Sequence, residues 1–401
     1  MNIFSGFFKS IAMALFLAIV FALASPSVAF SLEQKKDIEP ATSAQYLEIE
    51  EGQDFKILTV TDSHIDGIRS RNFLLDALKK LINEHDPDLI VFDGDNVDHD
   101  TDLIYFDKVA QFLEEKKIYW AAVMGNHDRD RERDGYPKGL FAQNTLLQRY
   151  NSFNKENGYC LYVESEYGYE EQLDYNNYPR EGNEWSRAKI GNYAVNIKNG
   201  DDIAYSLIFL DSGQHRAPYS EENGYIEQFQ VDWYQEYITD ISMDQLGVTE
   251  LEEDQYIPSM IFTHQPILEY IDAAAYALDG NYKGYIPQEY GFGYLNSIRG
   301  GTQNLDYNYG LFDAMKSVGG THIFVGHLHK NSSNILYEDI WLSHLTRVGR
   351  RGGEGKDYPY NKSTVSTLIT IDGATNEVDL CYALPNGITT KDIDEAYELN
   401  K

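Results

Sequence analysis

The chain has 401 residues and a formal net charge of −31, because 64 Asp and Glu residues outnumber 33 Lys and Arg residues. Such an acidic chain lacks the basic surface that polyanions bind, which argues against nucleic acid and anionic membranes as partners. The length is enough for one large domain with insertions.

Residues 1–29 have the pattern of a signal peptide. Lys9 precedes an apolar run at residues 11–24, and Ser27–Ala29 forms a cleavage site of small residues. The apolar run is short for a membrane span of about 20 residues, so no stable span is expected. We predict an exported protein, whether periplasmic, secreted or on the cell surface, with an acidic linker at residues 30–53.

Strand and helix patterns alternate from residue 54 onward. Apolar, β-branched runs predict strands at Phe55–Thr61, Leu89–Phe92 and Tyr119–Met124. Apolar residues at helical spacing predict helices between these strands, at residues 73–82 and 103–113. This β-α-β-α-β order implies a parallel sheet with right-handed crossovers.

Two Tyr- and Gly-rich insertions interrupt the pattern, at about residues 129–184 and 272–308. The first is either a solvated surface or a lining of the substrate site. The other elements are predicted as strands at Ala188–Ile197, Tyr205–Leu210, Ile335–Trp341, Val365–Asp372 and Glu377–Tyr382, and as helices at Phe229–Tyr237 and Leu311–Val318. The three C-terminal strands alternate like antiparallel strands of a second sheet. The domain then covers residues 54–390, followed by a tail at 391–401.

The chain has two cysteines, Cys160 and Cys381. In an exported protein they could form a disulfide, but two cysteines make a sparse framework. The alternative is two separate buried thiols, and the sequence leaves both open.

Five short polar segments contain the residue types that bind metals. They are Asp62–His64, Gly94–Asp98, Gly125–Asp128, Thr263–Pro266 and Gly326–His329, and most of them directly follow a predicted strand. In an open α/β sheet, the loops after the carboxyl ends of strands converge on one crevice. Carboxylate, imidazole and amide ligands without a thiolate suit a pair of Mn, Fe or Zn ions. The sequence therefore predicts a two-metal hydrolase.

The order of these segments, D-x-H, GDxxD, GNHD, a lone His and GHxH, resembles the calcineurin-like metallophosphoesterase superfamily, from about Phe55 to Tyr382. Three further segments are similar to its Dcr-two-type branch, which is related to purple acid phosphatases. They are Phe209–Gly213, Gln228–Trp233 and His264–Tyr270. The resemblance implies an α/β fold, a two-sheet α/β/β/α sandwich with the metal site at the strand ends.

The resemblance also implies two overlapping sets of ligands for two divalent ions. One set is Asp62, His64, Asp95 and His329, and the other is Asp95, Asn126, His264 and His327. His127 is left without a metal and corresponds to a proton donor beside the leaving group, with Asp128 placed to orient it. The alternative for His127 is a structural role behind the ligands.

One position departs from the plant- and mammal-type purple acid phosphatases. Those proteins have a tyrosine in the second motif that binds ferric iron, and here Asp98 takes its place. We therefore expect no ferric tyrosinate, and expect Asp98 to support the ligands without binding metal. Arg347, Arg350 and Arg351 form a small basic loop that either holds substrate phosphate or is solvated.

The function that follows is hydrolysis of phosphoesters outside the cytoplasm. The resemblance implies attack by a hydroxide between the two metals, with His127 as proton donor and a small phosphoester or a phosphoprotein as substrate. Phosphomonoesters are favoured, because an acidic surface repels long polyanions. A phosphodiesterase acting on cyclic nucleotides or lipid head groups is the alternative, and an inert scaffold of the same fold is a second one. The physiological substrate, the metal and the oligomeric state stay open.

Overall fold

The computed structural model describes residues 45–98, 102–129, 158–163, 191–213, 224–298, 302–303, 307–350 and 362–400. All of them belong to one compact unit, Ser43–Lys401. The predicted signal peptide, most of the first predicted insertion and Arg351 lie outside the described residues.

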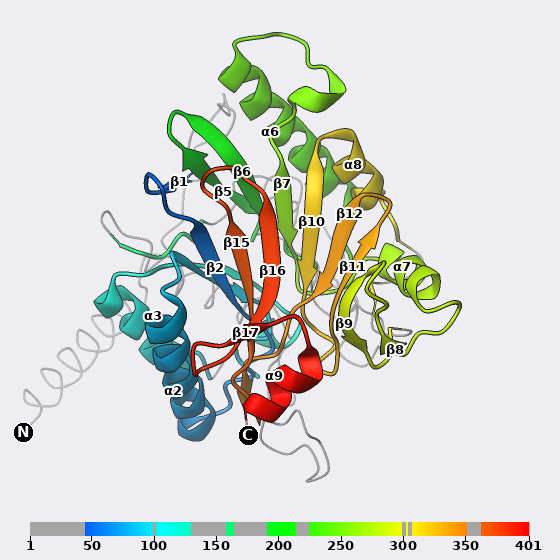
Figure 1. Ribbon diagram of the computed structural model, residues 1–401. Coiled ribbons are helices and arrows are strands. Elements are labelled where there is room, and N and C mark those ends of the chain that lie inside the picture. Colours follow the sequence, from blue (N-terminus) through cyan, green and yellow to red (C-terminus); the bar gives the residue numbers. More distant parts are fainter. Residues whose placement is uncertain are drawn as a thin grey trace, which may run out of the picture. The chain divides into compact units, whose positions relative to one another are not determined.

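One of the two large sheets has six strands in the order β17-β16-β15-β2-β3-β4 (Figure 1). Its strands are β2 (Phe55–Val60), β3 (Leu89–Asp93), β4 (Tyr119–Val123), β15 (Ser366–Ile371), β16 (Val378–Ala383) and β17 (Thr389–Thr390). The strands β2, β3 and β4 are parallel, as predicted, and α2 (Ile68–His85) and α3 (Leu103–Lys116) connect them. The remaining pairs are antiparallel.

The other large sheet has nine strands in the order β1-β5-β6-β7-β10-β12-β11-β9-β8. They are β1 (Gln45–Glu48), β5 (Tyr193–Asn199), β6 (Asp202–Phe209), β7 (Ser259–Phe262), β8 (Gly284–Tyr285), β9 (Gly291–Leu295), β10 (Gly320–Val325), β11 (Ser332–Tyr337) and β12 (Ile340–His344). At its centre β6, β7, β10 and β12 are parallel. The short strands β13 (Gly349–Arg350) and β14 (Lys362–Ser363) pair with each other and form a separate two-stranded sheet.

Two predictions about strands differ from the structure, because pairing with other strands decides where these segments lie. The strands β15 and β16 join the first sheet beside β2, not a second sheet of their own. The predicted strand at Ile335–Trp341 is divided: it contains the end of β11 and the start of β12, with a turn between them at Glu338 and Asp339, both at positive φ. Alternation of apolar residues cannot reveal this, because both arms alternate in the same way.

Three segments predicted as irregular contain regular structure. The predicted linker ends in β1, where Leu47 and Ile49 are buried. The second predicted insertion includes the last part of α7 (Glu269–Ala277) and the strands β8 and β9, which extend the larger sheet. The predicted tail forms α9 (Ile393–Leu399), whose first turn is capped by the Asp392 carboxylate accepting from the Glu395 N–H at 3.0 Å.

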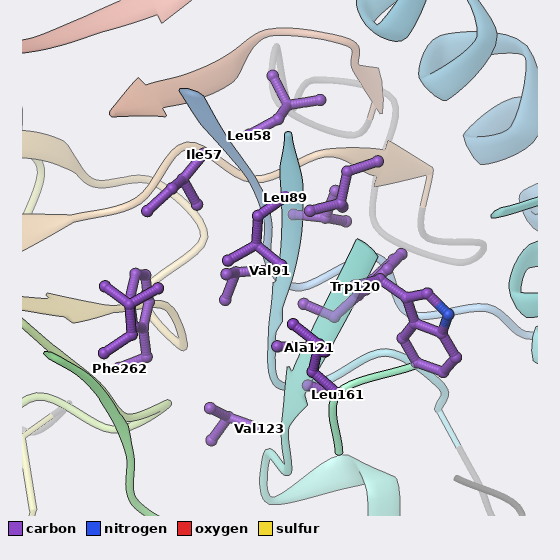
Figure 2. Packing of buried hydrophobic residues seen from close by; sticks show 14 of the residues in the cluster. Ile57, Leu58, Leu89, Val91, Trp120, Ala121, Val123, Leu161 and Phe262 are labelled. Atoms are coloured by element: carbon purple, nitrogen blue, oxygen red, sulfur yellow. The ribbon is translucent and has the colours of Figure 1, made fainter. Parts of the chain in front are cut away.

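The main core lies between the two sheets and under the helices of the first. Figure 2 shows Ile57 and Val91 on the side of the first sheet that faces Phe262, and Leu58 and Trp120 on the opposite side. The opposite side packs on α3, where the rings of Phe106 and Trp120 meet at 6.0 Å. Each face of the sheet is therefore buried, as expected for parallel strands.

The larger sheet presents a row of stacked rings to this core. Phe209 stacks on Phe262 at 5.3 Å, and Phe262 stacks on Phe324 at 4.9 Å, on neighbouring strands β6, β7 and β10. The helices α6 (Gln228–Leu246), α7 and α8 (Leu311–Ser317) also pack on this sheet (Figure 1). Two mixed sheets with flanking helices confirm the predicted sandwich.

Two further features concern the predicted environment of the chain. Cys160 and Cys381 are separate thiols, the first buried and the second half-buried. Among the described residues, no helix combines the length and apolar character needed to cross a bilayer.

We predict that Phe106→Ala lowers the free energy of unfolding by about 3–5 kcal/mol, because Phe106 is fully buried between Phe92 and Trp120. The matched control is Ile104→Ala on the same helix, where the side chain is 57% exposed and we expect a change within about 0.5 kcal/mol. Urea unfolding curves of the two variants measure the difference. Equal losses would contradict the assigned packing of α3.

Candidate metal centre

The predicted metal-binding residues all lie just after the carboxyl ends of strands. Asp62 and His64 follow β2, Asp95 follows β3, and the Asn126–Asp128 segment follows β4. On the larger sheet, His264 follows β7, and His327 and His329 follow β10. Both sheets thus contribute to one site at their carboxyl ends, as the order of motifs predicts.

The structure brings six of these side chains into two adjacent clusters that suit a dinuclear metal site. Asp62, His64, Asp95 and His329 form one cluster, and Asp95, His264 and His327 form the other, with the donor atoms of each within 4.8 Å of one another. The Nε2 atoms of His64 and His329 are 2.9 Å apart, and Nε2 of His264 lies 3.2 Å from Oδ2 of Asp95. Asp95 is common to both clusters.

Three side chains of the clusters, Asp62, Asp95 and His264, have one polar atom fixed by a hydrogen bond and another that points to the site. Oδ2 of Asp62 accepts from the Thr61 hydroxyl and the His327 N–H, and Oδ1 of Asp95 accepts from the His127 N–H. Nδ1 of His264 donates to the Asp93 carbonyl at 2.8 Å. The second atoms, Oδ1 of Asp62, Oδ2 of Asp95 and Nε2 of His264, are buried without a hydrogen-bond partner.

Those three buried atoms are the test of whether the site fits metal ions. A buried polar atom without a partner costs free energy, so native structures pair nearly all of them. Carboxylate oxygens and imidazole nitrogens that converge on common points are the donors that Mn, Fe and Zn accept. The site therefore fits two divalent ions, with Asp95 between them.

Backbone conformation at the site departs from the ordinary range. Asp62, His64, Asp95 and His327 all have positive φ, between 44° and 66°. Residues other than glycine rarely adopt this conformation, and such strain clusters at functional sites. Backbone hydrogen bonds from Asp62 N to Gly94 O and from His64 N to Asp95 O, 3.0 and 2.9 Å long, hold it in place.

Two motif glycines permit the close approach of the loops. A Cβ on Gly125 would lie 2.2 Å from Oδ1 of Asp95, and a Cβ on Gly326 would lie 1.9 Å from the Thr61 hydroxyl oxygen. Either contact would displace a carboxylate or the residue that holds one. The glycines of the GNHD and GHxH motifs are therefore required by packing against the ligands.

The electrostatics of the metal-free site show how strongly it demands positive charge. Burial alone would raise the pKa of Asp95, but the His264 and His127 imidazoles hold that pKa well below its usual value. Burial would likewise lower the pKa of His264, but the Asp95 and Asp62 carboxylates raise it to about 10. The neighbouring carboxylates therefore favour positive charge at His264.

Asp98 has the role expected for it. Its carboxylate lies 2.6 Å from Nδ1 of His64, and since a carboxylate only accepts, Nδ1 donates and Nε2 carries the lone pair toward the site. Burial lowers the pKa of His64 to about 4, even though Asp98 opposes this shift, so the ring is neutral and ready to bind metal.

Asp128 has contacts other than the predicted ones. Its two oxygens accept the backbone N–H groups of Val97 and Gly125 at 3.0 and 2.7 Å, which ties the GNHD loop to the loop after β3. The contacts that the structure describes for Asp128 do not include one to the His127 imidazole. Burial raises the pKa of Asp128 to about 7, and Asp95 adds to the shift.

One residue of the basic loop, Arg347, is not solvated. Arg347 is buried, and its Nε donates to the Asp62 carbonyl at 3.0 Å, so it supports the strained backbone of a ligand. Arg350 is half-buried in β13. No sequence pattern identifies a buried arginine whose partner is a main-chain oxygen 285 residues away.

Two supporting residues were missed at the sequence level. The Thr61 hydroxyl donates to the Asp62 carboxylate and, at 3.0 Å, lies against the Asp93 carbonyl. Gln265 places its amide nitrogen 3.5 Å from Oδ1 of Asn126, which is itself buried at the site. Each is next in sequence to a predicted metal-binding residue, and the sequence offered no other indication of its supporting role.

Fold and site together define a two-sheet sandwich with two adjacent Asp/His clusters, consistent with a dinuclear metal site, after the strand ends. The sequence model described as calcineurin-like phosphoesterase matches residues 55–331. The chain therefore belongs to the calcineurin-like phosphoesterase family.

More specific similarities are distant. Probable inactive purple acid phosphatase 29 of Arabidopsis thaliana is 23% identical over 308 residues, which cover 69% of this chain and 67% of that protein. A dimetal phosphatase from Danio rerio superposes with a TM-score of 0.44 and 11% identity, covering 81% of this chain and 98% of that one. Purple acid phosphatase PPD1 from yellow lupin gives 0.41 and 12%, covering 86% and 55%.

We predict that Asp98→Ala weakens metal binding about 10–100-fold, because His64 loses the partner that fixes its tautomer. Asp98→Asn keeps an oxygen that can accept from Nδ1 and should recover much of the loss. Competition of Zn²⁺ or Mn²⁺ with a fluorescent chelator measures both affinities. If Asp98→Ala bound metal as tightly as the unmodified chain, Asp98 would have no part in orienting His64.

Proposed function

We propose that this chain hydrolyses phosphoesters with two divalent ions, and phosphomonoesters in preference to diesters. The observation that carries the proposal is the convergence of Asp62 Oδ1, Asp95 Oδ2 and His264 Nε2, three buried atoms without partners, inside a site of this family. When bound, the ions supply a hydroxide nucleophile and neutralise charge that develops on the phosphoryl oxygens.

The ligand sets follow the two clusters. Asp62, His64, Asp95 and His329 hold one ion, and Asp95, His264 and His327 hold the other. Asn126 joins the second set on the resemblance of its motif. The protein's own contribution is to fix each ligand from behind. Asp98 orients His64, and the Asp93 carbonyl orients His264, so that each ring presents Nε2. Mn, Fe and Zn suit these donors, and Asp98 in place of a tyrosine argues against a ferric tyrosinate.

His127 is proposed as the proton donor to the leaving group. Its ring lies 5.0 Å from the ring of His64, and its side chain is half-buried, whereas His64 and Asp95 are buried. The backbone N–H of His127 donates to the Asp95 carboxylate, which fixes His127 beside the residue that both clusters share. An imidazole in this place can protonate a departing alkoxide at neutral pH.

The finer assignments rest on sequence. The segments at Phe209–Gly213, Gln228–Trp233 and His264–Tyr270 support membership of the Dcr-two-type branch, and residues 1–29 support export. The net charge of −31 favours a small phosphoester or a phosphoprotein over a polyanionic substrate. A phosphodiesterase acting on cyclic nucleotides or lipid head groups is the alternative within the same chemistry.

An inert scaffold is the alternative from another class, and the printed name of the Arabidopsis relative includes the words "probable inactive". A scaffold has no need to keep buried donors without partners. This chain has all seven proposed ligands and His127. Two bound ions together with no hydrolysis of any phosphoester in a broad panel would favour the scaffold and overturn the proposal.

We predict that Asp95→Ala reduces hydrolysis of an aryl phosphate at least about 10²-fold and lowers metal content from two ions per chain, since one carboxylate serves both clusters. The control is Asp76→Ala, whose carboxylate is 73% exposed and should leave both quantities unchanged. Metal analysis and kcat/KM for the aryl phosphate and its diester measure the effect. Full activity after chelation would refute the two-metal mechanism.

We predict that His127→Ala keeps both metals but loses about 10²–10⁴-fold in rate on alkyl phosphates, because the leaving group loses its proton donor. The loss should shrink for aryl phosphates whose leaving groups are weak bases and need no proton. A leaving-group series at constant metal content measures this. An equal loss across the series would indicate a structural role for His127.

A further inference from the structure

A second cavity lies away from the metal centre. Its volume is about 740 Å³, and it opens between the β8–β9 hairpin, β10, β12, β16 and α9, which lie close together in Figure 1. His322 of β10 lines it, and on the order of 15 Å of extended chain separates His322 from the metal-site residue His327. None of the proposed metal ligands lines the cavity.

His322 presents a lone pair to this cavity. The Thr321 hydroxyl donates to the Ser259 carbonyl at 3.0 Å, so the contact of 2.9 Å between that hydroxyl and Nδ1 of His322 must be donated by Nδ1. Nε2 is then an acceptor, and the part of the chain that the structure describes gives it no hydrogen-bond partner. The residue is only 5% exposed, and burial lowers its pKa to about 3, so the ring is neutral.

The other walls are also electron-rich. The ring of Trp341 lies nearly parallel to that of His322, 6.4 Å away, and Phe292 and Tyr285 add two more aromatic rings. Aromatic faces carry negative potential and attract cations. On α9, the Asp394 carboxylate lines the cavity and accepts from the Tyr285 hydroxyl.

Lys391, a cation of the chain itself, forms part of the cavity wall. Nζ of Lys391 lies 2.7 Å from the Asp379 carboxylate and 5.8 Å from the centre of the Phe292 ring. This exposed lysine shows that a carboxylate and an aromatic face lie at the right separation to hold an ammonium group together. A ligand cation would compete with Lys391 for both.

We propose that this cavity binds a small organic cation with N–H donors, a primary amine or a guanidinium. Nε2 of His322 accepts a hydrogen bond from it, and the rings of Phe292 and Trp341 and the carboxylates of Asp379 and Asp394 stabilise its charge. A quaternary ammonium would leave Nε2 unsatisfied, and an anion would meet carboxylates. The site does not depend on the proposed hydrolysis.

Agmatine, which has a guanidinium at one end and an ammonium at the other, is the probe, added to the full chain at physiological salt, where exposed charges are screened beyond about 8 Å. Isothermal titration calorimetry should show binding of agmatine and none of the neutral 1,4-butanediol. His322→Leu should weaken binding roughly tenfold, since Nε2 is lost as an acceptor.

Lys391→Met gives the decisive comparison, because it should strengthen binding roughly three- to tenfold by releasing Asp379 and Phe292. The matched control is Lys316→Met: this lysine has the same arrangement elsewhere, 2.7 Å from Glu338 and 5.9 Å from the Phe312 ring centre. We expect no change there. Lys391 is exposed, so its variant tests the site even if His322→Leu fails to fold.

Three results would overturn the proposal. One is no binding of agmatine at millimolar concentration. Another is affinity that is unchanged or weaker in Lys391→Met. The third is an equal gain in Lys316→Met, which would mean that agmatine responds only to the overall negative charge of the surface.

Discussion

The buried carboxylate of Asp95 is the interaction on which the rest of the site depends. One of its oxygens is held by the His127 N–H, and the other lies between His64 and His264, at 3.5 and 3.2 Å. A fully buried carboxylate needs positive charge close by, and the His264 imidazole, which follows a strand of the larger sheet, is the main group that lowers the pKa of Asp95. Asp95 is common to both clusters, so it would contribute to holding either of two metal ions.

The packing of the sandwich brings the strand ends of both sheets to this site. The stacked rings of Phe209, Phe262 and Phe324 belong to the main core and pack the larger sheet against it. After the strand ends the backbone turns sharply, at positive φ in several ligands, and Gly125 and Gly326 let the loops touch. Core packing thus supplies the free energy that holds strained ligand loops in place.

Sequence reasoning succeeded where a residue's role follows from its position after a strand. The six Asp and His residues that the structure brings together are an example, because motif and strand are neighbours in the chain. It failed where distant segments decide, and Arg347 is an example, since its burial depends on the Asp62 carbonyl. The partners of Asp128, the place of β15 beside β2 and the helix α9 are set by contacts of the same kind. Periodicity carries no information about which distant surface covers a segment.

His264 and His322 are each held by a hydrogen bond at Nδ1, but their surroundings shift the pKa of the two rings in opposite directions. In each, Nδ1 is fixed by a nearby oxygen, while Nε2 of His264 faces Asp95 at 3.2 Å and His322 lines the second cavity. His264 faces two carboxylates, which raise its pKa to about 10 against burial, whereas His322 has burial alone, which lowers its pKa to about 3. The first position therefore demands a strong positive charge such as a metal ion. The second offers a neutral lone pair, so its ligand must bring the donor hydrogen itself.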